Sequence, residues 1–198
     1  MATPDTAARE RIIAAVAVVI ARDGYRGSKI HDIAKEARVS LRTFYLYFPN
    51  KEALFLELHA RVVKGVISAI DGGVSFDQPW RDAMSQGFET YFRILTAEPR
   101  LTTAIISELT TISDESFEAW EYARGEFATL MSTLVERGRA ANPGIPSRPL
   151  SPLMARSILG GVLELVTSRV ISGEVERLPE LVDTATDLLW SVVTNVEG

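Results

Sequence analysis

The 198-residue sequence contains no cysteine, which excludes a disulfide framework, a thiolate metal site and a cysteine nucleophile. Its two histidines, His31 and His59, lie far apart without a carboxylate cluster at ligand spacing, so we predict no metal site. We also recognise no nucleophile–base pair, P-loop or dinucleotide fingerprint, and therefore assign no catalytic residue and expect no cofactor. An enzyme that uses Glu108 or Glu164 as acid or base is the alternative from another class.

The sequence also lacks a hydrophobic run long enough to cross a membrane. The longest N-terminal run, Ile12–Ala21, is shorter than the roughly 20 apolar residues that a span requires. Charged residues flank it on both sides and no small-residue cleavage site follows, so we predict neither a signal peptide nor membrane association. The absence of cysteine fits a reducing cytoplasm, which is the location we expect.

Acidic residues exceed basic ones overall, but the excess is unevenly distributed. Residues 1–65 carry eleven Lys/Arg and seven Asp/Glu, a net charge of +4, whereas residues 66–198 carry ten and nineteen, a net charge of −9. A basic segment in an acidic chain indicates contact with a polyanion, although chance variation in surface charge could give the same difference.

The hydrophobic pattern predicts helices almost throughout, because β-type alternation never holds for more than a few residues. We expect helices at about 7–21, 30–37, 41–47, 51–70, 77–96, 99–111, 114–140, 150–173 and 179–196. Gly24 should end the first helix, and Ser28, Ser40, Asn50 and Asp114 are candidate N-caps. The predicted fold is all-α, with an N-terminal three-helix domain (1–50) and a C-terminal helical bundle (51–198).

Two short helices, 30–37 and 41–47, are separated by a tight turn, which is the spacing of a helix-turn-helix. In the segment RVSLRTFYLYFPNKEAL (38–54), Phe44 and Phe48 lie one turn apart and should face the core together with Val39. Arginine, threonine and tyrosine then occupy the outward faces. Arg42 could contact guanine, the Thr43 methyl or a leucine could contact a thymine methyl, and tyrosine hydroxyls could reach phosphates.

Helix N-termini at Ser28 and Ser40 could receive phosphate oxygens, and Lys51 at the start of the next helix could bind another phosphate. A three-helix subdomain with a purely structural role is the alternative. It gives no reason for exposing arginine, tyrosine and lysine together.

The motif SLRTFYLYFPNKEAL (40–54) and the preceding GYRGSKIHDIAKEA (24–37) resemble the DNA-binding signature of the TetR/AcrR (tetracycline-repressor) family. The resemblance covers roughly the first 60 residues. It implies a dimeric transcriptional repressor with a helix-turn-helix domain and a C-terminal ligand-binding and dimerisation domain.

By position in the family motif, the phosphate- or sugar-binding residues would be Ser28, Lys29, Thr43, Tyr45, Tyr47 and Lys51. The base-facing residues would be His31, Leu41, Arg42 and Thr43, and for His31 a simply solvated position is equally open. The chain departs from the motif at Arg38, where the family usually has a turn glycine and arginine would be strained, and at Arg42, where a small residue is common.

In the C-terminal part, aromatic residues at helical spacing are either core or the wall of a ligand cavity between helices. The candidate pocket residues are Trp80, Phe88, Tyr91, Phe92, Glu108, Phe117, Trp120, Phe127 and Glu164. The two glutamates could receive a polar ligand group, or they could form salt bridges or lie at an exposed rim.

The last two predicted helices are very apolar, and Gly160-Gly161 suggests close approach of another backbone. They could form a four-helix interface with a second copy or an internal core of a monomer. The candidate interface residues are Ile158, Gly161, Leu163, Leu165, Leu189 and Trp190.

Together these features predict a ligand-responsive transcriptional regulator, most simply a repressor. It would bind a palindromic operator in double-stranded DNA as a homodimer and be released by a small apolar effector. A DNA-binding protein that takes no ligand is a second alternative.

Overall fold

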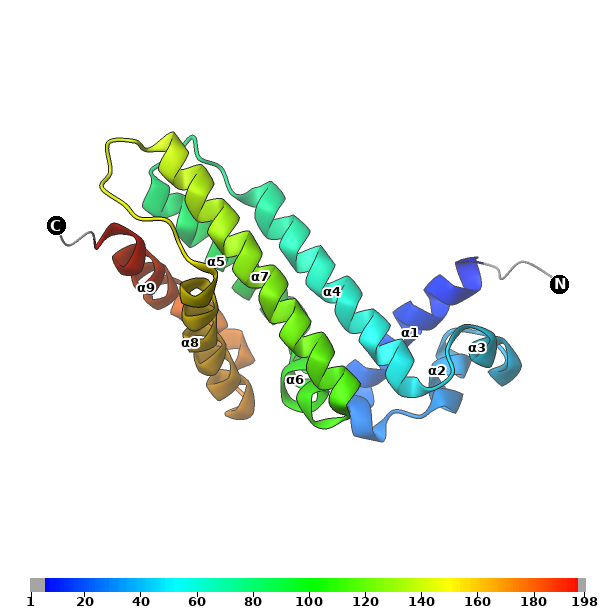
Figure 1. Ribbon diagram of the computed structural model, residues 1–198. Helices are drawn as coiled ribbons and strands as arrows, with labels where there is room; N and C mark the ends of the chain where they lie inside the picture. The colour runs from blue at the N-terminus through cyan, green and yellow to red at the C-terminus, as the bar shows by residue number, and fades with distance from the viewer. Residues whose placement is uncertain (1–5, 196–198) are drawn as a thin grey trace. The chain divides into compact units, whose positions relative to one another are not determined.

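The computed structural model describes residues 6–195, apart from the side chain of Thr110, and within them the secondary structure is entirely helical (Figure 1). The elements are α1 (Thr6–Gly27), α2 (Ile30–Glu36), α3 (Leu41–Tyr47), α4 (Lys51–Gly73), α5 (Trp80–Ala97), α6 (Pro99–Glu108), the 3-10 helix η1 (Leu109–Thr111), α7 (Asp114–Ala141), α8 (Pro152–Ile171), the 3-10 helix η2 (Val175–Leu181) and α9 (Val182–Thr194). This confirms the all-α prediction. Over the same residues, no helix combines the length and hydropathy that a membrane span requires.

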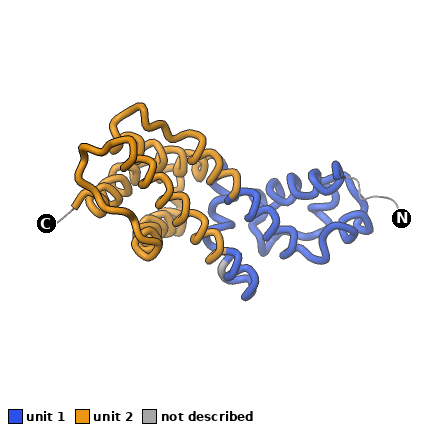
Figure 2. Tube along the Cα trace, turned by 45° about the horizontal axis from the view of Figure 1, so that its top comes forward, with its two compact units in different colours: residues 1–63, 98–119 blue, residues 64–97, 120–198 orange. Residues whose placement is uncertain are grey.

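The chain divides into two compact units, coloured separately in Figure 2. The first unit contains residues 1–63 and 98–119, and the second contains residues 64–97 and 120–198. The boundaries pass through α4 and α7, so each of these helices contributes residues to both units. Residues 98–119, which include α6 and η1, thus fold with the N-terminal helices. A functional division after residue 50 stays a prediction.

Two of the predicted helix caps are confirmed in the first unit. The Ser40 side chain accepts a hydrogen bond from the Thr43 N–H at 3.0 Å and begins α3. The Asn50 Oδ1 accepts one from the Ala53 N–H at 2.7 Å and begins α4. The helical path of α1 breaks at Gly24, whose φ of 72° is the left-handed conformation that favours glycine.

The predicted cap at Asp114 is wrong, because Asp114 is already the first residue of α7. The preceding turn is closed by two serines instead. Ser113 Oγ accepts a hydrogen bond from the Ser116 N–H at 3.1 Å, and Ser116 Oγ accepts one from the Ser113 N–H at 3.0 Å. This reciprocal pair satisfies backbone donors that would otherwise be unpaired at the helix start.

The core of the first unit forms where α1 packs against α2, α3 and α6. Its fully buried side chains are Ile12, Val16, Val19, Ile20, Ile33, Phe44, Leu54, Phe55 and Leu109. Because Phe44 belongs to α3 and is completely enclosed, the core fixes how this short helix is rotated about its axis. The opposite face of α3 is consequently left outside the core.

In the second unit, α5 packs against α9 and η2. Trp80 at the start of α5 is buried, with its ring edge-on to Trp190 of α9 at a centroid distance of 5.5 Å. Gly138 of α7 lies directly against Trp80, since a Cβ at position 138 would come within 1.9 Å of the indole nitrogen. The glycine therefore makes room for the largest buried side chain of this unit.

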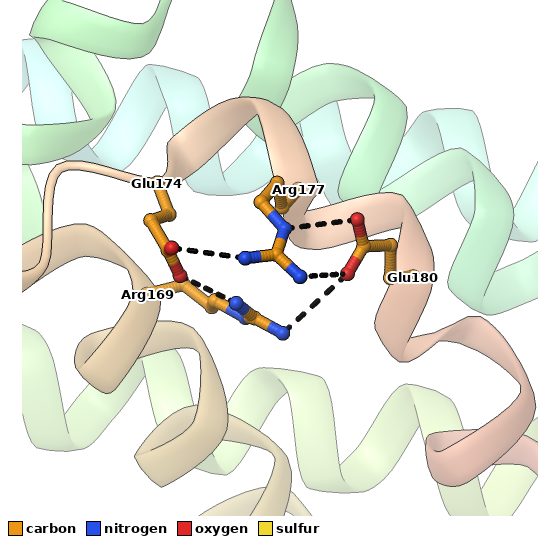
Figure 3. Close-up of polar contacts among 4 residues, drawn as sticks. All are labelled: Arg169, Glu174, Arg177 and Glu180. Atoms are coloured by element: carbon orange, nitrogen blue, oxygen red, sulfur yellow. Dashed lines mark hydrogen bonds and ion pairs between the residues drawn. The ribbon is translucent and has the colours of Figure 1, made fainter.

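The end of α8 is joined to η2 by two arginines and two glutamates that form a closed network (Figure 3). Arg177 binds Glu180 through two hydrogen bonds of 2.9 Å and binds Glu174 at 2.9 Å. Arg169 of α8 pairs with Glu174 and reaches Glu180 at 3.5 Å. The bond from Arg169 lowers the pKa of Glu174, and the bond from Arg177 lowers that of Glu180. We assign this network the structural role of fixing the α8–η2 turn.

Candidate nucleic-acid interface

The turn between α2 and α3 has a regular helix-ending geometry. The Val39 N–H donates to the Ala34 carbonyl at 2.9 Å, and the Arg38 N–H donates to the Lys35 carbonyl at 3.1 Å. This pair of hydrogen bonds is a Schellman motif. In this motif the first residue after the helix, here Arg38, adopts the left-handed conformation. Arg38 does so with φ 55°, and it is the sole non-glycine residue with positive φ in the described range. The turn therefore keeps a positive φ although arginine stands where the family usually has glycine.

Helix α3 presents polar and apolar side chains outward above its buried anchors. Phe44 is fully buried and Phe48 is 4% exposed, with ring centroids 6.1 Å apart, as the spacing predicted. Arg42 is exposed and has no hydrogen-bond or ion-pair partner among residues 6–195. Tyr45 is 54% exposed, and its ring packs edge-on against Phe44 at 5.4 Å. The outer face of α3 thus carries the unpaired guanidinium of Arg42 and the Tyr45 ring that packs on Phe44.

The other predicted residues of α3 differ in solvent exposure. Leu41 is exposed, whereas Thr43 and Tyr47 are half-buried. The hydroxyls of Ser40 and Thr43 lie 2.8 Å apart and bond to each other. Leu46, which we did not place among the candidate residues, is 71% exposed and is the most exposed apolar side chain of α3.

The turn between α1 and α2 corrects one prediction. Ser28 does not cap α2, because Lys29 occupies the N-cap position and makes no side-chain cap bond. Ser28 is 3% exposed, and its hydroxyl donates to the Tyr25 carbonyl at 2.7 Å, so this side chain is turned away from any phosphate. Lys29 and His31 are exposed and remain available to a ligand.

Lys51 holds this same turn. Its ammonium donates to the Tyr25 carbonyl at 2.6 Å and to the Ser28 carbonyl at 3.0 Å, and it lies 4.1 Å from the centre of the Tyr25 ring. Burial lowers the pKa of Lys51, and the charge of Glu108 opposes that effect. A lysine has three N–H donors, so two are committed to the fold and one is left for a phosphate.

The predicted pocket residues are not brought together as one set. Trp80, Phe88 and Phe92 are buried, and Tyr91, Trp120 and Phe127 are half-buried. Phe117 is 52% exposed and Glu164 is exposed, so neither is enclosed by the fold. Glu108 belongs to the first unit, where its carboxylate accepts the Arg26 N–H.

An aromatic cluster joins α5 to α7 within the second unit. The Tyr91 ring lies 5.3 Å from Phe92 and 5.8 Å, edge-on, from Phe127, and Phe88 stacks on Phe92 at 6.3 Å. Burial raises the pKa of Tyr91 to about 12. The Tyr91 hydroxyl has no hydrogen-bond partner among the described residues.

The candidate interface residues also separate by burial. Ile158 and Leu189 are buried in their own chain, so they cannot form part of an exposed surface as we predicted. Leu163 and Trp190 are half-buried, and Gly161 and Leu165 are exposed. Further exposed apolar residues, which we did not predict, lie on the same two helices: Leu153, Met154, Ile171 and Leu188.

The glycine pair of α8 has side-chain neighbours rather than a close backbone within the second unit. A Cβ at Gly160 would meet the Arg124 guanidinium at 3.7 Å, and one at Gly161 would meet a Leu188 methyl at 3.7 Å. Both are ordinary contacts. The close backbone approach that the glycines suggested is therefore not made by these described neighbours.

Helix α3 follows the tight turn after α2 and exposes Arg42 and Tyr45. It is thus the second helix of a helix-turn-helix, which defines a DNA-binding protein. Comparison with known proteins identifies its relatives. Residues 12–58 match the model of the family described as "Bacterial regulatory proteins, tetR family". The chain is 25% identical over 186 residues to the fatty acid metabolism regulator protein of Bacillus subtilis, covering 93% of this chain and 95% of that protein. It is 32% identical over 126 residues to the HTH-type transcriptional regulator EthR of Mycolicibacterium smegmatis, covering 62% and 58%.

Solved structures agree with this assignment. FadR from Bacillus halodurans, a fatty acid degradation regulator, matches with a TM-score of 0.75 at 26% identity, covering 91% of this chain and 96% of that one. FadR from B. subtilis, solved in complex with stearoyl-CoA, matches in fold with a TM-score of 0.77 at 24% identity, covering 92% and 98%. The chain belongs to the tetR family of transcriptional regulators.

Proposed function

We propose that this regulator is a ligand-responsive repressor that binds a palindromic DNA operator as a homodimer and is released by a small apolar effector. The observation that carries the proposal is the outer face of α3. Arg42 is exposed there without a partner among the described residues, and the buried Phe44 fixes the orientation of the helix. An arginine held in this way can bind guanine O6 and N7 in the major groove.

The dimer follows from the geometry of operators. Two recognition helices related by a two-fold axis read half-sites one helical turn apart, about 34–36 Å. The exposed apolar residues of α8, including Leu165 and Ile171, support a self-complementary interface on this helix. Of the predicted interface residues, Gly161, Leu163 and Trp190 also remain proposed contacts.

The effector is proposed to carry an acyl chain. Support comes from the aromatic cluster around Tyr91 in the second unit and from the relatives, among them a B. subtilis regulator solved with stearoyl-CoA. The Tyr91 hydroxyl offers an unused donor that a carbonyl oxygen of the effector would accept. Aromatic side chains around a few polar groups are the usual lining of a small-molecule site.

Effector and DNA are expected to oppose each other through linkage. If the effector binds one conformation better and DNA binds the other, each lowers the affinity for its competitor by the same factor. To move the protein from mostly DNA-bound to mostly free, the effector must bind the free conformation several kcal/mol more tightly than the DNA-binding one. A shift from 99:1 to 1:99 needs about 5.5 kcal/mol.

The first test is selection of bound sites from random duplex DNA, followed by affinity measurements at several salt concentrations. We expect one palindromic sequence to be enriched and affinity to fall steeply with salt, because phosphate neutralisation releases counterions. Failure to enrich any sequence at low ionic strength would remove the repressor assignment.

The second test adds acyl-CoA thioesters and free fatty acids of increasing chain length to the protein–operator complex. We expect long chains to release the DNA and short chains to have no effect. In the Tyr91→Phe variant the same release should need roughly threefold to tenfold more effector, the usual worth of one hydrogen bond. Release by none of these compounds would redirect the search to other apolar ligands.

We propose no enzymatic activity. Glu108 is engaged by a backbone N–H, and Glu164 is exposed and makes no hydrogen bond or ion pair within the described residues, so neither is paired with a group that would make it a catalytic acid. We also propose a cytoplasmic location, where bacterial DNA is accessible.

A further inference from the structure

Leu46 is the most exposed apolar side chain of α3. At 71% exposure it is far more open than Leu41, at 44%. Successive residues of a helix are rotated by about 100°, so Arg42 and Leu46 both lie about 160° from the buried Phe44. They are one turn apart and therefore adjacent on the face directly opposite the core.

Single exposed leucines are normal on protein surfaces and usually need no explanation. Leu46 differs because of its neighbours. It follows Tyr45, which is 54% exposed, and it lies next to Arg42, which has no partner in the described part of the chain. All three share the face that the proposed function directs into the major groove.

The major groove offers one apolar feature for such a side chain, the C5 methyl group of thymine. A rise of 1.5 Å per residue separates Arg42 and Leu46 by about 6 Å along the helix. Base pairs repeat every 3.4 Å along each strand, so a helix lying along the groove would place the two side chains about two base pairs apart.

We propose that Leu46 is a specificity-determining residue that contacts a thymine methyl group about two base pairs from the guanine bound by Arg42. The inference rests on the proposed function, since α3 must enter the groove. It adds a sequence requirement that Arg42 cannot supply. Each half-site of the operator would contain a guanine and, at this short separation, a thymine whose methyl group is required.

The test uses the full-length protein and its selected operator, in which each thymine of a half-site is replaced in turn by deoxyuridine. This replacement removes only the methyl group and leaves base pairing intact. Dissociation constants are measured by fluorescence anisotropy for the wild type, Leu46→Ala and Leu41→Ala. The leucine at 41 is a matched control, because it is exposed on the same helix but lies only about 60° from Phe44.

We expect one uridine position to weaken wild-type binding about threefold to fivefold, the worth of burying one methyl group. Leu46→Ala should bind the thymine and uridine operators equally at that position, whereas Leu41→Ala should keep the difference. This non-additivity is the signature of direct contact in a double-mutant cycle. Unchanged melting temperatures would show that both variants are folded.

Two outcomes would overturn the inference. Leu46→Ala could remain as sensitive to uridine as the wild type, or no uridine position could matter while Leu46→Ala weakens every sequence equally, as a sugar contact would. Both differ from failure of the proposed function, in which the wild type would select no operator at all.

Discussion

The carboxylate of Glu108 accepts a hydrogen bond from the backbone N–H of Arg26, 82 positions earlier in the chain, at 3.1 Å from Oε2. Its other oxygen would lie 3.3 Å from a Cβ at Gly24, where α1 kinks with φ 72°. Lys51 grips the carbonyls of Tyr25 and Ser28 in the same turn. An anion at the end of α6 and a cation at the start of α4 therefore hold the donor and acceptor groups of one turn, immediately before α2.

Glu108→Ala should weaken operator binding by roughly threefold to tenfold, since one hydrogen bond contributes about 0.5–1.5 kcal/mol to ordering the turn. Removing a negative charge would by itself strengthen DNA binding slightly, so the sign of the change is informative. Glu126→Ala, at an exposed position of α7, provides the charge control and should not weaken binding. Affinity by anisotropy at fixed salt is the measurement. Equal behaviour of the two variants would mean that the Glu108 contact does not position the DNA-binding turn.

Lys51→Ala should reduce both stability and DNA binding. The Tyr25 and Ser28 carbonyls lose their ammonium donor, which costs about 1–2 kcal/mol of unfolding free energy. The melting temperature should fall by a few degrees. If the third N–H binds a phosphate, the slope of log affinity against log salt also decreases in magnitude by about one. A lower melting temperature with an unchanged slope would leave Lys51 a structural role only.

Arg42→Ala should relax the preference for one base pair of the operator. A good bidentate contact to guanine discriminates by about 1–3 kcal/mol, and the exposed side chain makes no contact that the fold needs. Binding to the selected site should therefore fall by roughly fivefold to 150-fold, while binding to unrelated DNA falls much less. Repeating the selection with the variant shows which position is lost. An equal loss on selected and scrambled sites would reduce Arg42 to a phosphate contact.

The sequence predicted several local features correctly because they depend on neighbours along the chain, although the caps predicted at Ser28 and Asp114 were wrong. The caps at Ser40 and Asn50 and the buried pair Phe44 and Phe48 follow from spacings of three or four residues. The Glu108–Arg26 bond joins residues 82 positions apart, and no periodicity indicates it. The identification of the family came from the 40–54 motif, whose residues are required together by one helix and the turn after it.

Helix α8 shows the opposite limit. Its apolar residues lie on most faces, so the pattern does not say which face is inside, whereas α9 is amphipathic. Leu189 is 5% exposed and Leu165 is 37% exposed, although both read as equivalent leucines in the sequence. Only the packing of the second unit separates core from surface here, and the interface prediction had mixed the two.

Leu165→Glu should convert the proposed dimer into monomers without unfolding them, because the charge would be placed on an exposed part of α8. Sedimentation velocity and the melting curve are read together. Tyr122→Glu, at a residue of α7 that is 69% exposed, should leave the dimer intact. Leu189→Glu should instead destabilise the fold by roughly 2–5 kcal/mol, since it replaces a buried leucine. A Leu165→Glu protein that still sediments as a dimer would contradict an interface through this face of α8.

Arg38→Gly should stabilise the protein, although it removes a charge from the region that meets DNA. The left-handed conformation, with φ 55° at Arg38, costs a non-glycine residue about 1–2 kcal/mol. Glycine adopts it freely but makes the unfolded chain more flexible, which costs about 0.5–1 kcal/mol. The balance is a gain of roughly 0.5–1 kcal/mol, measurable by urea unfolding. Arg38→Gln keeps the strain and removes the charge, so it should leave stability unchanged, and Arg38→Val should destabilise because a β-branched residue tolerates this conformation poorly. A glycine variant less stable than the glutamine variant would mean that the arginine side chain stabilises the turn by more than its backbone strain costs.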